Sequence, residues 1–358
     1  MRRTLDQCVS ELQQIRDSDV QRGEYIGFES LDEHGGTSGK PFISIRKGFP
    51  VYIAAMPHAG KSEWLFEMLI NLSTFSKWRH CIYSGEEGNA AEIYIQLVEK
   101  YIGKPYRRYK QRGVLNGYAM SESEAEQGRY WVSQHFFVLS DETDYTPAQF
   151  CKEVAAWEKE LGFSFDTMAF DPFNDFVKDL KPYGNRVELW LEDELKHWRR
   201  ECKSHNRAGF LVNHIAQIPA EKDKESGRRF IPMPEPTEWA MGQNWYRRGF
   251  LMLTLWRPPA DMLNPDTGIP YANNEVIIAV HKAKPKGVAC LGKKSMFWEW
   301  SRFRYYENLD GKLFFAGEGR AHLSALKDVV TDQAREMYGY ASGRNLPQSQ
   351  EQNDNPPF

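Results

Sequence analysis

The chain has 358 residues, a formal net charge of −3 and a pI near 6.3. This balance excludes a protein whose whole surface is basic, so nucleic-acid binding would have to come from local patches or from a lumen formed by assembly. No run of about twenty apolar residues exists, so we expect no membrane-spanning helix. The N-terminus lacks the apolar core of a secretory signal. Five widely spaced cysteines predict a reduced cytoplasmic protein with no zinc site and no disulfide framework.

Residues 1–22 are predicted to form an N-terminal linker helix that precedes the main domain. Its apolar positions share one helical face and are Leu5, Cys8, Val9, Leu12 and Ile15. That face can pack on its own domain or dock on a neighbouring subunit. The pattern leaves both alternatives open.

The most informative stretch is 51–62, where an apolar run, a tight loop and a helical pattern follow one another. Such a strand, loop and Gly-Lys-Ser helix start is typical of a phosphate-binding loop, whose free N–H groups and dipole attract phosphate oxygens. Lys61 is expected to reach the β- and γ-phosphates, and the Ser62 hydroxyl to hold Mg²⁺. Ala55 stands where the usual pattern has glycine. The predicted nucleotide-binding residues are Ala55, Pro57, His58, Ala59, Gly60, Lys61, Ser62 and Glu63.

Short apolar runs alternate with helical patterns along the rest of the chain. Strands are expected at 42–45, 51–54, 80–84, 136–139, 165–170, 209–213, 251–255 and 276–280, and helices at 90–102, 147–161 and 187–204. This alternation predicts an α/β fold with a mostly parallel central sheet flanked by helices. We place the ATPase domain at 23–318, a C-terminal helix at 319–341 and a disordered tail at 342–358, which is nearly devoid of apolar residues.

Acidic and basic side chains follow three of the expected strands. Asp171 ends the strand at 165–170, and its position suits the carboxylate that completes a Mg²⁺ site. Glu86 follows the strand after the phosphate loop and is our candidate to activate water, with Glu87 as the alternative. His214 follows the strand at 209–213 and is a candidate sensor of the γ-phosphate. Because parallel strands end at one edge of a sheet, these side chains are expected to meet Lys61 there.

Five motifs together resemble the DnaB-type replicative helicases, and in particular the helicase half of phage primase–helicases and the mitochondrial helicase Twinkle. They are Gly-Phe-Glu-Ser-Leu-Asp (27–32), Pro-His-Ala-Gly-Lys-Ser-Glu-Trp (57–64), Ser-Gly-Glu-Glu (84–87), Phe-Asp-Pro-Phe-Asn (170–174) and Val-Asn-His (212–214). The resemblance covers about residues 24–305. It implies a RecA-like P-loop NTPase that binds ATP and Mg²⁺ between the subunits of a homo-oligomeric ring, most often a hexamer.

The resemblance also assigns cations near the nucleotide. In the family a neighbouring subunit contributes a Lys-x-Arg pair from a late strand, and here Lys282 and Lys284 hold these places. Lys284 therefore keeps the charge of an arginine finger but not its bidentate fork. Lys286 or Arg304 is an alternative source of that cation. Arg257 matches a family arginine beside the nucleotide.

Two loops match the family's DNA-binding loops. The first spans 178–186, and the second spans 221–230, where the candidate phosphate ligands are Lys222, Lys224, Arg228 and Arg229. Contacts to phosphates alone are independent of base sequence, as a translocating motor requires. Acids interleave with these cations, so a solvated loop of mixed charge is the competing interpretation.

The sequence thus predicts an ATP-dependent, ring-forming DNA helicase that translocates on single-stranded DNA, with the family's 5′→3′ polarity implied by resemblance. Two alternatives remain open: a RecA-like recombinase or filament-forming DNA-dependent ATPase, and a nucleotide-binding scaffold with weak hydrolysis. The tail ends Asp-Asn-Pro-Pro-Phe (354–358), which resembles the acidic tails that dock replication proteins. A plain disordered end is the alternative for this segment.

Overall fold

The computed structural model describes residues 4–17, 23–32, 40–107, 110–111, 114–115, 119–216, 218–223, 227, 229–260 and 262–318. The predicted C-terminal helix and tail (319–358) and two DNA-binding candidates, Lys224 and Arg228, lie outside these residues. Of the expected N-terminal helix, the structure describes the 3₁₀ turn η1 (Asp6–Cys8) and the helix α1 (Val9–Asp17).

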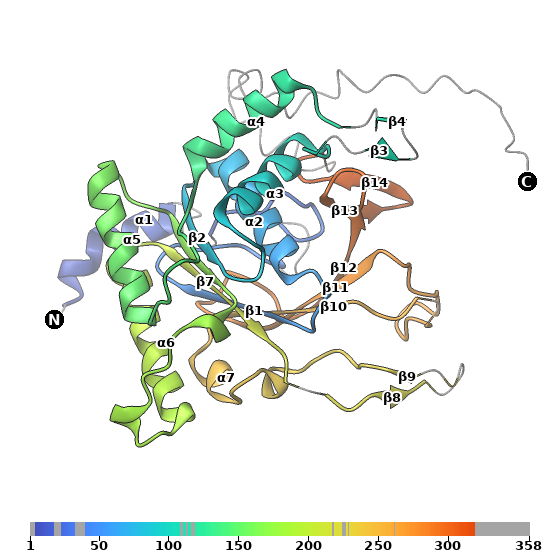
Figure 1. The fold of residues 1–358 in the computed structure, drawn as a ribbon. Coiled ribbons are helices and arrows are strands. Elements are labelled where there is room, and N and C mark those ends of the chain that lie inside the picture. The colour runs from blue at the N-terminus through green and yellow to red at the C-terminus, as the bar shows by residue number, and fades with distance from the viewer. Residues whose placement is uncertain are drawn as a thin grey trace, which may run out of the picture.

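A single ten-stranded sheet in the described part of the chain organises the molecule, in the order β14-β13-β12-β11-β10-β1-β7-β6-β2-β5 (Figure 1). The strands from β10 to β5 in this order are parallel, and those from β10 to β14 are antiparallel. Their bounds are β1 (Pro50–Ala55), β2 (His80–Ser84), β5 (Phe136–Val138), β6 (Thr167–Asp171), β7 (Ala208–His214), β10 (Leu251–Trp256), β11 (Glu275–Ala283), β12 (Gly292–Glu299), β13 (Arg304–Leu309) and β14 (Lys312–Phe315). The predicted α/β class with a mostly parallel sheet is confirmed.

Helices cover both faces of the sheet (Figure 1). Alternate residues of β1 show how: Ile53 belongs to the core beneath α2 and α3, whereas Tyr52 belongs to the core beneath α5, α6 and α7. A central strand buried on both sides has to be apolar throughout, which is why 51–54 stood out in the sequence. The helices are α2 (Lys61–Ser76), α3 (Ala90–Ile102), α4 (Glu122–His135), α5 (Pro147–Leu161), α6 (Val187–Ser204) and α7 (Asn244–Arg248).

The smaller elements lie in the connections. They are the hairpins β3 (Lys110–Gln111) with β4 (Val114–Leu115) and β8 (Glu221–Lys222) with β9 (Arg229–Phe230), and the 3₁₀ turns η3 (Phe173–Asp175), η4 (Lys181–Tyr183) and η5 (Pro236–Glu238). Among the described helices, a search for one with the length and apolar character needed to cross a bilayer finds none.

Several expectations about single elements were wrong or incomplete. The strand expected at 42–45 is reduced to isolated bridges, Ile43 with Ala289 and Ile45 with Glu24, so this segment lies across the domain without joining the sheet. The antiparallel half of the sheet beyond β11 and the helix α4 were not predicted. α4 is a largely polar helix, and β12 is largely exposed at its start, so neither makes a strong apolar pattern.

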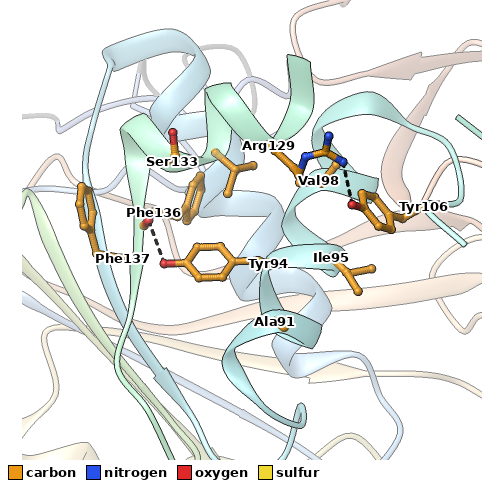
Figure 2. Close-up of a pocket in the computed structure, with 10 residues that line it drawn as sticks. Ala91, Tyr94, Ile95, Val98, Tyr106, Arg129, Ser133, Phe136 and Phe137 are labelled. Atoms are coloured by element: carbon orange, nitrogen blue, oxygen red, sulfur yellow. Dashed lines mark hydrogen bonds between the residues drawn. The ribbon is translucent and has the colours of Figure 1, made fainter. Parts of the chain in front are cut away.

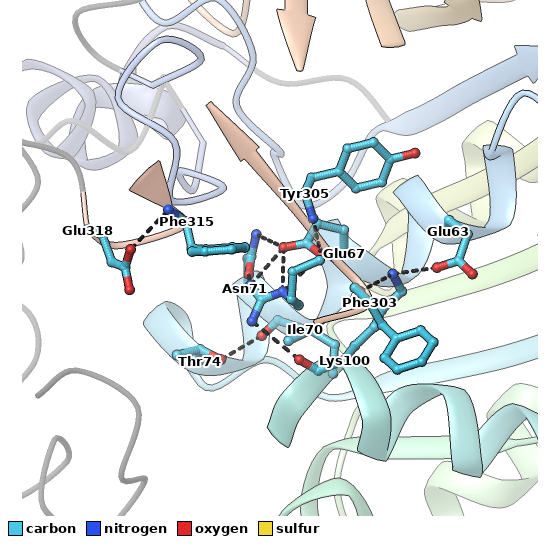
Figure 3. A network of polar contacts seen from close by, with 11 residues as sticks. Glu63, Glu67, Ile70, Asn71, Thr74, Lys100, Phe303, Tyr305, Phe315 and Glu318 are labelled. Carbon is cyan, nitrogen blue, oxygen red and sulfur yellow. Dashed lines mark hydrogen bonds and ion pairs between the residues drawn. The ribbon is translucent and has the colours of Figure 1, made fainter. Parts of the chain in front are cut away.

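A buried ion pair joins the two halves of the sheet across α2 (Figure 3). Glu67 of α2 accepts from the Arg304 guanidinium of β13, with an Nε–Oε1 distance of 2.8 Å and an Nη2–Oε1 distance of 2.7 Å. Asn71 accepts from the same guanidinium at 2.8 Å. Arg304 is therefore fully engaged in the core. The alternative that it serves as a catalytic cation is wrong for this geometry.

Candidate nucleotide site

The phosphate loop connects the end of β1 to the start of α2. Gly60 adopts φ +85°, a conformation that disfavours other residues, and His58 also has positive φ, at +63°. Ala55 is the last residue of β1 and pairs regularly with Leu255 and His214. Because extended backbone suits alanine as well as glycine, the departure from the usual pattern at this position carries no penalty.

Lys61, Glu86 and His214 form one chain of charge-assisted contacts at this edge of the sheet. The Lys61 Nζ donates to Glu86 Oε2 at 2.8 Å, and His214 Nε2 lies 2.9 Å from Glu86 Oε1. Partial burial alone would raise the pKa of Glu86, but Lys61 and His214 outweigh it and hold that pKa below its ordinary value. The carboxylate is therefore ionised at neutral pH and can accept a proton.

Ser62 and Asp171 form a second pair beside the first. The Ser62 hydroxyl donates to Asp171 Oδ2 at 2.6 Å, and Asp171 is completely buried at the end of β6. Its other carboxylate oxygen, Oδ1, has no hydrogen-bond partner among the described residues. Burial raises the pKa of Asp171 to about 7, against the lowering effect of Ser62 and Lys61. An orphaned oxygen beside a serine hydroxyl suits a hard cation that prefers oxygen ligands.

Two further acids lie near this cluster. Glu87, the alternative catalytic carboxylate, accepts from Gln96 Nε2 of α3 at 3.0 Å and so is tied to that helix. Asp175, which the sequence did not single out, has a pKa raised first by burial and then by the neighbouring charge of Glu86. Its signal in the sequence was only its place four residues after Asp171, in the turn η3.

The remaining predicted nucleotide ligands divide into two groups. Arg257 follows β10, its Nε is buried without a partner among the described residues, and its guanidinium lies 5.8 Å from the ring centre of Trp300. Trp300 is 64% exposed, and the sequence analysis missed it. Glu63 instead forms an ion pair with Lys100 of α3, with an Nζ–Oε2 distance of 2.5 Å. The structure thus ties Glu63 to α3, whereas Arg257 keeps an unpaired donor.

Lys282 and Lys284 do not lie at this edge of the sheet. The end of β11 pairs antiparallel with the start of β10, so Lys282 stands opposite Met252, at the edge remote from the phosphate loop. Its Nζ donates to the Tyr246 carbonyl and lies over that tyrosine's ring at 4.8 Å. The two lysines therefore have no contact with the nucleotide site of their own chain.

The DNA-binding candidates that the structure describes stand opposite each other on a hairpin. Lys222 of β8 pairs in register with Arg229 of β9, and both residues are exposed. This hairpin extends away from the sheet (Figure 1). The arrangement places at least two cations on one projecting arm.

A cavity of about 490 Å³ lies between α3, α4 and β5, and its lining is mostly apolar (Figure 2). Tyr94 and Phe136 line it, and Arg129 at its rim donates to the Tyr106 hydroxyl at 2.8 Å. β7, β6 and β2 separate β5 from β1 in the sheet, so this cavity lies apart from the phosphate loop.

The raised pKa of Asp171 predicts a pH-dependent stability. Above pH 4 the unfolded chain loses this proton, while the folded protein keeps it until about pH 7, so the stabilisation present at low pH is lost as pH rises. Relative to Asp171→Asn, the wild type should lose roughly 3 kcal/mol of unfolding free energy between pH 5 and pH 8. Urea unfolding at both pH values measures this difference. Asp141→Asn, at an exposed site, is the matched control and should show none; an equal change in both variants would contradict the assignment.

Comparison with known proteins places this geometry in context. No protein-family model matches the chain. Over 201 residues, 55% of its length, the chain is 26% identical to the Twinkle homolog protein, chloroplastic/mitochondrial, of Arabidopsis thaliana, and the matched segment spans about a quarter (26%) of that protein.

Two solved structures share the fold. The ATPase domain of one DnaB-like helicase, solved on its own, superposes with a TM-score of 0.63 at 13% identity, covering 85% of this chain and 99% of that one. A second DnaB-like replicative helicase, described with its interactions with primase, superposes with a TM-score of 0.62 at 13% identity, covering 85% of this chain and 68% of that one. The resemblance inferred from the five motifs is confirmed: this chain has the RecA-like ATPase fold of the DnaB-type replicative helicases.

Proposed function

We propose that this chain is the motor of an ATP-dependent replicative DNA helicase that assembles as a homo-hexameric ring on single-stranded DNA. The observation that carries the proposal is the convergence of Lys61, Glu86 and His214 with the pair Ser62 and Asp171 at one edge of the sheet. These are the groups that phosphoryl transfer to water requires: a phosphate cradle, a metal carboxylate and a base.

The residues present fit ATP with Mg²⁺. Gly60, Lys61 and the N-terminus of α2 would hold the phosphates, and Ser62 with the orphaned Asp171 Oδ1 would hold the cation. When bound, Mg²⁺ neutralises charge that develops on the transferred phosphoryl group. Arg257 and the exposed ring of Trp300 form a platform suited to the base.

Glu86 would accept the proton of the attacking water. Its lowered pKa keeps it ionised at neutral pH, and its two oxygens are held by Lys61 and His214, so its position is fixed. Lys61 would exchange this contact for phosphate oxygens when nucleotide binds. His214 would then report the state of Glu86 to β7 and to the hairpin that follows it.

Assembly is supported by the place of Lys282 and Lys284. They lie at the edge remote from their own phosphate loop, so they can act on a nucleotide only if it is held by another copy of the chain. A closed ring supplies such a neighbour to every subunit. The projecting hairpin with Lys222 and Arg229, extended by Lys224 and Arg228, would line the channel and contact successive phosphates.

Polarity and partners complete the proposal. We expect 5′→3′ movement and a cytoplasmic replication role by resemblance. One structural relative is described together with primase. On this chain, the segment 342–358 would be the docking site for replication proteins.

ATP turnover with and without single-stranded DNA tests this function. We expect turnover that DNA stimulates, that falls to background in Lys61→Ala, and that accompanies unwinding of a forked duplex and closed rings in negative-stain images. Open filaments on DNA without unwinding would favour a recombinase-type ATPase. Nucleotide binding without turnover would overturn the helicase and favour a scaffold.

A further inference from the structure

A second collection of cations lies at the sheet edge opposite the phosphate loop. A cleft of about 140 Å³ opens there between α6, the end of α7 and the segment after β11. Five of the side chains that line it are basic: Lys196, Arg199, Arg247, Arg248 and Lys284. We call this feature the basic cleft.

The basic cleft is built by segments that are fixed to one another. The Lys284 backbone N–H donates to the Phe250 carbonyl at 2.9 Å, which holds the segment after β11 beside the start of β10. Asn244 of α7 donates through Nδ2 to the Glu188 carbonyl of α6 at 2.7 Å. The cations therefore converge because of the fold, from three places far apart in the sequence.

Most of this charge is not neutralised within the chain. Arg248 and Lys196 share the carboxylate of Glu192, and Lys196 also lies 3.7 Å from Asp193. The other three cations, Arg199, Arg247 and Lys284, form no ion pair with any residue that the structure describes. Five cations thus face two carboxylates, and the cleft is strongly positive.

The shape and charge point to a small anion. A cleft lined by one sign of charge concentrates the field and attracts the opposite charge. The two unpaired guanidiniums, on Arg199 and Arg247, offer forked donors that match the oxygens of a phosphoryl group. The volume is well below that of pockets that enclose drug-sized molecules, so a phosphoryl group fits better than a nucleoside.

That phosphate cannot belong to the nucleotide on the same chain. β1 and β10 run in parallel register from Val51 with Leu251 to Ala55 with Leu255. Four residues of strand separate the two edges by about 13 Å, and the phosphate loop lies beyond the far end. The basic cleft and the nucleotide site are therefore two separate sites.

We propose that the basic cleft is a second phosphate-binding site, with Arg199 and Arg247 as its bidentate ligands. The phosphoryl oxygens come either from a nucleotide held by another copy of the chain or from the backbone of a nucleic acid. The existence of the site does not depend on the proposed helicase function; only the choice between these sources does.

Binding of inorganic tripolyphosphate, followed by calorimetry, tests the site. The full chain is used with Lys61→Ala, which disables the phosphate loop and leaves the basic cleft intact. We expect residual binding that Arg199→Gln with Arg247→Gln weakens by about tenfold or more. Arg200→Gln, an exposed neighbour on α6 outside the cleft, is the matched control and should leave the affinity unchanged. Absence of residual binding, or equal affinities in all variants, overturns the proposal.

Two further arms identify the source. If it is a nucleic acid, the Arg199→Gln/Arg247→Gln protein loses single-strand affinity, and its salt dependence falls by about 0.7 per charge removed. If it is the nucleotide of another copy, mixing that protein with Lys61→Ala protein restores ATP turnover, because one supplies the loop and the other the cleft. Either result supports the site. A wild type without turnover would refute the helicase while leaving the tripolyphosphate result intact.

Discussion

Replacing Glu86 with glutamine is expected to lower ATP turnover by about 10²–10⁴-fold, the usual contribution of a positioned general base. Glutamine preserves the size of the side chain but cannot accept a proton. Nucleotide affinity should be kept or increased, because Lys61 loses the 2.8 Å ion pair that competes with phosphate oxygens. Steady-state hydrolysis and binding of a fluorescent ATP analogue measure the two effects separately.

Glu87→Gln is the matched control for this prediction. Glu87 has the same side chain one residue away, but its carboxylate is held by Gln96 of α3 and not by Lys61. We expect turnover in this variant to stay within a few-fold of the wild type. The opposite result, with Glu87→Gln inactive and Glu86→Gln active, would move the base to Glu87.

The parallel half of the fold was predictable from sequence because its strands are buried on both faces. The interior strand β2 and the helices α3, α5 and α6 have the bounds expected from apolar periodicity. The antiparallel half was missed because β12 is partly exposed and alternates weakly. The helix α4 was missed although its start carries a readable signal, the capping box of Ser121 and Glu124.

The site was predictable to the level of which strand ends meet. The rule that parallel strands end at one edge is enough to gather Lys61, Glu86, Asp171 and His214, and the structure brings these four together. Individual contacts were not predictable, because they depend on side-chain directions. No local pattern indicates that Glu86 bridges Lys61 and His214.

Contacts between distant segments were beyond the sequence altogether. The basic cleft joins residues of α6, α7 and the segment after β11, which share no motif and meet only through packing. Arg304 shows the same limit in reverse. In the sequence it was one more cation near the family's arginine-finger position, yet β13 lies over α2 and buries it against Glu67.

Arg304→Ala is therefore expected to destabilise the fold by about 3–5 kcal/mol, the cost of leaving a buried partner charge unpaired. Glu67 is completely buried, and Arg304 supplies its guanidinium donors as well as donating to the Lys100 carbonyl at 3.3 Å (Figure 3). Urea unfolding followed by circular dichroism measures the change. Lys312→Ala, on an exposed position of β14, is the control and should shift stability by less than about 0.5 kcal/mol.

A double variant separates charge from packing. In Glu67→Met with Arg304→Met both charges are gone and apolar volume remains, so this protein should be more stable than Arg304→Met alone by at least about 1 kcal/mol. That difference arises because the single variant buries an uncompensated carboxylate. If the double variant were instead less stable than the single one, the pair would not be the source of the effect, and Arg304 would act through its contact with Asn71. Because the Glu67 carboxylate also accepts from the backbone N–H of Tyr305, whose hydroxyl donates to the Gly60 carbonyl, the same variants should loosen the phosphate loop and raise the Kd for ATP.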